Sequence, residues 1–89
     1  MFQKGKAEMI ELDGFKSWLT NNTTYSKRVI SNIVSRFKRA NTILPWFDDD
    51  IYQFRLEQND TYKNLSVNVR SQIKKAVKLY FQYHKEAKN

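Results

Sequence analysis

Lysine and arginine side chains dominate the chemistry available to this sequence, and they stand in two stretches that contain no acidic residue. These stretches cover residues 14–47 and 61–85, whereas Asp and Glu are confined to residues 1–13, to 48–60 and to Glu86. The net charge of +7 is therefore sorted along the chain rather than spread evenly. Helices formed by the acid-free stretches should have faces of one sign, which suit a polyanion.

Phosphate binding is the chemistry that these basic residues favour, because Lys and Arg neutralise phosphates and release their counterions. The basic candidates that fall off the apolar stripes of their helices are Lys27, Arg28, Lys38, Arg39, Arg70, Lys74, Lys75 and Lys78. Arg28 and Arg70 also have the forked donors that read guanine edges. The alternative is a solvated face that keeps a small domain soluble.

Other site chemistries find little support in the composition. There is no cysteine, and the single histidine, His84, falls in an apolar stripe, so a zinc site is not expected. The run 48–50 is three aspartates without the alternating spacing and trailing glutamate of a calcium loop, and it is interpreted as charge at a helix start. Without a nucleophile–base pair or a Gly-rich phosphate loop, we expect no catalysis and no cofactor.

The elements that must position the basic residues are predicted to be helices only. Two glycines and one proline are too few for the frequent turns of a small strand-rich domain. Apolar spacing predicts an all-α fold with helices at about 8–20, 24–44, 49–58 and 66–85. Gly14 weakens the first of these by about 1 kcal/mol relative to alanine, so that helix has an alternative start near Asp13.

The helix boundaries follow from individual residues. Thr23 or Thr24 is the expected N-cap of the second helix, and Pro45 ends it. Ser66 is the expected cap of the last helix, after a loop at 58–61. The third helix should bury Ile51 and Phe54, with Tyr52 or Leu56 on the flanks.

Thirteen aromatic residues bring much surface area to a small chain, and most fall at core spacing. Core packing is therefore preferred over stacking on single-stranded nucleic acid. Trp46 and Phe47 follow the proline and do not fall into the apolar pattern of a helix. Two roles are considered for them, a hydrophobic lid and a contact with a partner.

The chain length predicts a single helical domain at 8–86, with a flexible terminus at 1–7 and frayed residues at 87–89. The first residues lack the apolar region of a secretory signal, and no apolar run approaches the roughly 20 residues needed to span a bilayer. We therefore expect a cytoplasmic protein that does not bind membranes.

The order of motifs resembles the core-binding domain of tyrosine recombinases and phage integrases, often called SAM-like. The resemblance rests on the segment 15–19 (FKSWL), the 24–26 turn (TYS) before a long amphipathic helix, and the 69–81 helix (VRSQIKKAVKLYF) after Ser66. It implies a compact non-parallel bundle of four helices that binds double-stranded DNA through its second and fourth helices. It adds Thr24, Ser31 and Ser71 to the candidate DNA contacts, beside Lys27, Arg28, Arg70, Lys74 and Lys75.

The same resemblance implies a partner that this chain lacks. A complete recombinase has a second domain with arginine, lysine, histidine and tyrosine catalytic residues, and 89 residues cannot hold it. The chain is thus expected to be either an excised domain or a protein that uses the DNA-binding module alone. We expect no recombinase catalysis from it.

Two other functions stay open at this point. One is a regulatory adaptor whose basic faces meet an acidic protein, with the acidic segment 48–60 as a complementary patch. The other is a basic amphipathic helix on anionic membrane. The membrane alternative is weaker, because a domain of this size needs the apolar stripe of its last helix for the core.

Overall fold

The computed structural model describes residues 10–88, and within that range it contains five helices. They are α1 (Leu12–Asn22), α2 (Lys27–Ile43), α3 (Ile51–Gln58), α4 (Asp60–Lys63) and α5 (Val67–Lys88). No strand occurs among the described residues, so the all-α prediction is confirmed. The predicted flexible terminus at 1–7 and the predicted helix start at Glu8 lie outside the described residues, and α1 begins close to the alternative start near Asp13.

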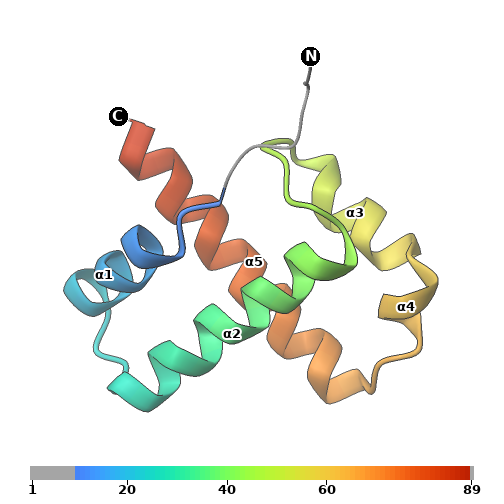
Figure 1. Cartoon of the computed structure of the whole chain (residues 1–89), viewed down its shortest axis with the longest axis horizontal. Coiled ribbons are helices and arrows are strands. Elements are labelled where there is room, and N and C mark those ends of the chain that lie inside the picture. The colour runs from blue at the N-terminus through green and yellow to red at the C-terminus, as the bar shows by residue number, and fades with distance from the viewer. Residues whose placement is uncertain (1–9, 89) are drawn as a thin grey trace.

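The centre of the fold is a crossing of α2 and α5 (Figure 1). α1 packs against both helices on one side of the crossing, and α3 with α4 lies on the other side, beside the first turns of α5 (Figure 1). The principal extents are 35 × 34 × 18 Å, so the molecule is a flat slab. A slab this thin leaves α2 and α5 each with a long side toward solvent.

The core is built largely from aromatic rings, as predicted. Phe37 of α2 stacks on Tyr80 of α5 with ring centroids 4.0 Å apart, and Phe15 of α1 packs edge-on against Tyr80 at 5.1 Å. All three rings are buried, so they are not platforms for nucleic-acid bases. Trp46 is also completely buried, with its ring 4.9 Å from Tyr80, and the lid or partner role considered for it is wrong.

The boundaries of α2 differ from the prediction at one end. The N-cap is Ser26, whose Oγ accepts a hydrogen bond from the Val29 N–H at 3.2 Å. The predicted caps Thr23 and Thr24 are wrong, because the Thr23 hydroxyl instead donates to the Leu19 carbonyl at the end of α1, at 2.6 Å. The C-terminal end is confirmed: Leu44, before the proline, leaves the helical conformation.

The buried side of α3 was predicted wrongly. Ile51 and Phe54 are 42% and 61% exposed, whereas Tyr52 and Leu56 are fully buried. Apolar residues span more than half of the circumference of this short helix, so its pattern does not define which of them face the core. The Tyr52 hydroxyl donates a 2.7 Å hydrogen bond to the Leu44 carbonyl, which the C-terminal end of α2 leaves without a helical partner.

The predicted loop at 58–61 is wrong in part, because α4 starts there. Asn59 caps this one-turn helix, with its Oδ1 accepting hydrogen bonds from the N–H groups of Thr61 at 2.8 Å and Tyr62 at 3.3 Å. The fold therefore has five helices where four were predicted, and the four-helix arrangement of the recombinase resemblance is not reproduced in that detail.

The last helix, α5, starts as predicted and ends later. Ser66 caps it by accepting from the Val69 N–H at 3.2 Å, and the helix continues to Lys88, beyond the predicted end at 85. Ile73, Val77 and Tyr80 from its apolar stripe are at most 1% exposed. That stripe belongs to the core and is not available to lie on a membrane. No helix within residues 10–88 is both long and apolar enough to cross a bilayer.

Candidate nucleic-acid interface

The solvent side of α2 is basic along its length. The helix contains five basic residues and no acidic one. Lys27 and Arg28 are exposed at its start, and Lys38 and Arg39 are exposed near its end. Because each residue advances a helix by about 1.5 Å, Arg28 and Arg39 stand roughly 16 Å apart along the axis. The residues between them on this side include small polar ones, Ser31 and Ser35, which leave room for a close approach.

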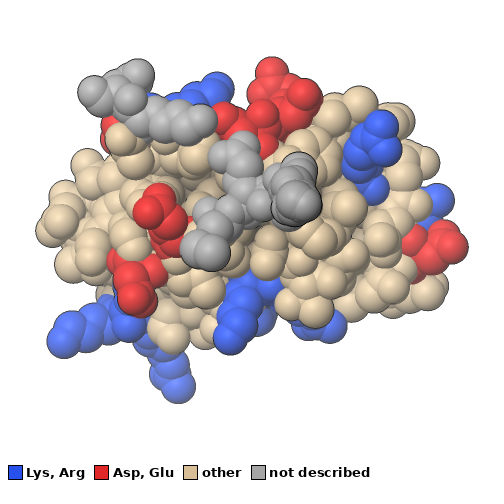
Figure 2. Space-filling model, turned by 45° about the horizontal axis from the view of Figure 1, so that its top comes forward, with Lys and Arg blue, Asp and Glu red and all other residues tan. Residues whose placement is uncertain are grey.

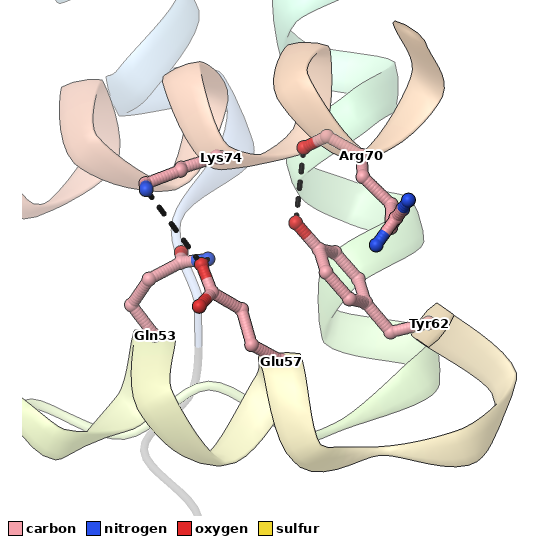
Figure 3. A network of polar contacts seen from close by, with 5 residues as sticks. All are labelled: Gln53, Glu57, Tyr62, Arg70 and Lys74. Atoms are coloured by element: carbon pink, nitrogen blue, oxygen red, sulfur yellow. Dashed lines mark hydrogen bonds and ion pairs between the residues drawn. The ribbon is translucent and has the colours of Figure 1, made fainter. Parts of the chain in front are cut away.

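The basic residues of α5 do not form one surface. Lys74 points toward α3, where its Nζ lies 3.8 Å from Glu57 Oε2 (Figure 3). Gln53 of α3 donates to that same carboxylate oxygen at 2.8 Å, which holds the carboxylate in place. The charge of Lys74 is thus partly compensated within the protein.

Arg70 and Ser71 lie on the same side of α5 as Lys74. They line a shallow hollow of about 590 Å³ together with residues of α3 and α4. The Tyr62 hydroxyl of α4 donates a 3.0 Å hydrogen bond to the Arg70 carbonyl (Figure 3). The pKa of this tyrosine is raised, mainly because burial disfavours its ionised form. Arg70 is half-buried beside the acidic segment, so its surroundings differ from those of the α2 arginines.

Lys75, the next residue, points to the opposite side, toward α2. Its Nζ lies 5.1 Å from the centroid of the Tyr25 ring, within the range of a cation–π contact. It lines a hollow of about 210 Å³ at the crossing, together with Val29, Asn32, Ile33, Arg36 and Gln72. Arg36 donates from Nε to Gln72 Oε1 at 2.7 Å, which ties α2 to α5.

The surface where the two helices meet gathers cations from both of them, and none of these has a carboxylate within ion-pair distance among residues 10–87. Arg28 and Arg39 lie on the flank of α2 that holds Arg36, as a 100°-per-residue wheel shows. We define the α2–α5 basic surface by the following residues. They are Arg28, Arg36 and Arg39 of α2 with Lys75 of α5. The predicted contact Lys78 is exposed one turn after Lys74, and the wheel places it nearer to Lys74 than to Lys75. Among residues 10–87, Lys74 and His84 are the only basic side chains with a carboxylate within ion-pair distance.

Basic side chains gather along one edge of the folded surface, although the two signs are not fully separated (Figure 2). Figure 2 shows Lys and Arg side chains along the lower edge and others at the upper right, while Asp and Glu side chains lie at the upper edge, on the left of the face and at the right edge. The predicted contacts Lys27, Ser31 and Lys38 occupy the part of α2 farther from α5. Thr24 is exposed in the loop before α2 and lines a shallow hollow with Asn21 and Asn22.

The structure adds three polar residues that the sequence reasoning did not assign to the site: Asn32, Arg36 and Gln72. A signal for Arg36 was present, since the wheel places it at the boundary between the apolar and polar arcs of its helix. Its pairing with Gln72 carries no local signal, because it depends on how two distant helices cross.

His84 and the aspartates at 48–50, which the sequence analysis also considered, make contacts within the protein. His84 is half-buried, with its ring 4.8 Å from that of Trp46 and its Nε2 3.3 Å from Asp48 Oδ2. Asp49 accepts a 2.9 Å hydrogen bond from the Ile51 N–H at the start of α3, in keeping with the predicted role of the aspartates at a helix start. Within residues 10–87, no group of three acidic or histidine side chains could hold a metal ion.

Comparison of the chain with protein-family models, with curated proteins and with solved structures finds no match in any of the three. The resemblance to recombinase core-binding domains therefore rests on the motif residues alone.

Proposed function

We propose that this chain is a DNA-binding module that contacts duplex DNA through the α2–α5 basic surface. The observation that carries the proposal is the meeting of two basic helices at a surface whose cations have no carboxylate partner among residues 10–87. Uncompensated cations on adjacent elements are the footprint expected for a phosphate backbone.

The dimensions of the surface suit a duplex. A helix with its side chains is about 10–12 Å wide, and the major groove of B-form DNA is about 12 Å wide. With the small side chain of Ser35 between Arg28 and Arg39 on the wheel, this flank of α2 fits against a groove while the two arginines reach the flanking phosphates. Arg28 and Arg39, roughly 16 Å apart, are the residues that we expect to bracket the contact.

The recombinase resemblance extends this proposal. It suggests that the module positions DNA for a separate catalytic domain and performs no catalysis alone. In that family the last helix contributes from its first turns, which here hold Arg70, Ser71 and Lys74. Because Lys74 pairs with Glu57 while Lys75 faces α2, we assign the larger contribution of α5 to Lys75.

The test is a fluorescence-anisotropy titration of duplex DNA at several salt concentrations. We expect log K to fall linearly with log salt, by about 0.9 per phosphate contact. The double variant R28E/R39E should lose binding at moderate salt. The variant R55E/K63E changes net charge equally on α3 and α4, and it should retain most of the affinity. Lack of binding by the native chain even at low salt, or binding that ignores salt, overturns the proposal.

A second candidate function is a protein-interaction adaptor, favoured by an exposed apolar patch. Phe54 and Ile51, at 61% and 42% exposure, line a hollow of about 330 Å³ with Leu44. In this reading the basic faces meet an acidic protein and DNA affinity is negligible. The variant K74E/K75E would then abolish a protein complex, whereas the DNA titration above would give no signal with the native chain.

A further inference from the structure

The hollow at the crossing of α2 and α5 has the composition of an anion site. Its walls combine an apolar floor, from Val29 and Ile33, with two amides and two cations. The amides are Asn32 and Gln72, and the cations are Arg36 and Lys75. Its volume of about 210 Å³ is smaller than the roughly 300–1,000 Å³ typical of sites for whole small molecules. A single charged group fits it better than a complete nucleoside.

Arg36 is oriented before any ligand arrives. It is half-buried, and its Nε–H is engaged by Gln72 Oε1 at 2.7 Å. This bond uses the side edge of the planar guanidinium, so the N–H groups of the two terminal nitrogens remain as a parallel pair of donors. Such a pair matches two oxygens of a phosphate. Gln72 is therefore a positioning residue for Arg36.

Lys75 supplies a second positive charge to the hollow, and its surroundings differ from those of Lys74. The ammonium of Lys75 is held over the Tyr25 ring at 5.1 Å, whereas that of Lys74 lies 3.8 Å from the Glu57 carboxylate. A cation–π contact leaves the charge uncompensated, because the ring carries no formal charge. Within residues 10–87, no carboxylate lies within ion-pair distance of Arg36 or Lys75.

We propose that this hollow binds one phosphate group, with the terminal nitrogens of Arg36 and the ammonium of Lys75 contacting its oxygens. The inference rests on the proposed function, in that the expected source of the group is a phosphodiester of the DNA backbone. Asn32, one helical turn before Arg36, supplies an additional amide donor at the rim. The phosphate anchors the crossing of the two helices on the duplex and fixes the orientation of α2.

The first arm of the test compares matched variants in the anisotropy titration. K75Q removes the charge beside the hollow, and K74Q removes its neighbour facing α3. We expect K75Q to weaken binding about five- to tenfold and to reduce the slope of log K against log salt by about 0.9, whereas K74Q changes the slope by less than half of that. Q72E places a carboxylate against Arg36 and should weaken DNA binding at least tenfold. Q58E, an equal charge change on exposed α3, should cost less than about threefold. Circular dichroism of each variant checks that it is folded.

The second arm follows the Arg36 Nε–H resonance by NMR, first with duplex DNA and then with inorganic phosphate alone. We expect the resonance to shift with both ligands in the native chain, and the shift with phosphate to shrink in K75Q but not in K74Q. If DNA binds and depends on salt while the K75Q and K74Q slopes agree and the resonance does not move, the phosphate site is wrong and the proposed function stands.

If DNA does not bind at low salt, the proposed function fails, and the phosphate titration decides the site separately. A shift of the Arg36 resonance that K75Q weakens then identifies a site for free phosphate. An unchanged resonance overturns the inference.

Discussion

The hydroxyl of Tyr83 on α5 occupies the position that a Cβ on Gly14 of α1 would take. The next atom of that ring, Cζ, would stand 3.2 Å from such a Cβ. The ring cannot easily move away, because it is buried and packs against Phe15 and Trp18. The glycine that weakens the first helix is thus required by the close approach of α5.

From this contact we expect G14A to destabilise the fold by about 1–3 kcal/mol, the usual cost of overpacking. Helix propensity alone gives the opposite sign, a gain of about 1 kcal/mol. In a Y83F background the hydroxyl is gone and only the 3.2 Å approach of Cζ remains, so the same substitution should cost clearly less. Urea unfolding of the four proteins of this double-mutant cycle measures the coupling. Equal effects of G14A in both backgrounds would contradict the role given to Tyr83.

Trp46 and Phe54 provide a test of the aromatic core. Trp46 is fully buried against Tyr80, Phe81 and His84, so W46A should cost about 3–5 kcal/mol in the free energy of unfolding. Phe54 is 61% exposed, and F54A should change stability by less than about 0.5 kcal/mol. Chemical denaturation of both variants decides between the observed burial and the predicted one, in which Phe54 was the core residue.

Tyr52 makes stability depend on pH in the alkaline range. Burial raises the pKa of its hydroxyl above the ordinary value, so the unfolded chain ionises first as pH rises. The stabilisation is complete below pH about 10 and is lost as pH rises from there toward the folded pKa.

We therefore expect Y52F to cost about 1–2 kcal/mol at pH 8, mainly through the lost hydrogen bond to the Leu44 carbonyl. The difference between the native chain and Y52F should shrink above pH about 10. Urea unfolding at pH 8 and at pH 11 measures both values. A difference that is the same at the two pH values would be inconsistent with this explanation.

The cap of α2 distinguishes two neighbouring hydroxyl residues. S26A removes the side chain that accepts from the Val29 N–H and should cost about 1 kcal/mol. T24A, in the exposed loop, should stay within about 0.5 kcal/mol of the native chain. Thermal unfolding followed by circular dichroism separates the two. A larger loss of stability for T24A than for S26A would show that Thr24, as the sequence predicted, is the N-cap.

The long helices were predictable because their signals are periodic and local. The apolar stripes of α2 and α5, the proline after Leu44 and the serine before Val67 are each readable without knowing the rest of the fold. The short elements were not. The apolar residues of the eight-residue α3 span more than half of its circumference, so the pattern defines no unique buried side, and α4 is only one turn long. Their placement follows from contacts with distant residues, such as the hydrogen bond from Tyr52 to Leu44.

The candidate interface shows the same division. The basic character of both helices could be predicted from the distribution of charge along the chain. The different surroundings of Lys74 and Lys75 could not be predicted from the sequence, because they depend on which elements pack against each flank of α5. The hollow is a property of the crossing, so Arg36 and Gln72 become a pair only after two segments 36 residues apart are brought together.

The sorting of charge between the aspartates before α3 and the cations of α2 and α5 has a kinetic consequence. A molecule with separated charge experiences a torque in the field of a highly charged rod, so it rotates before it touches. For a chain that binds DNA with its basic side, productive encounters would be enriched well above random collisions. Added salt would then lower the association rate more than it raises the dissociation rate, which stopped-flow mixing can resolve.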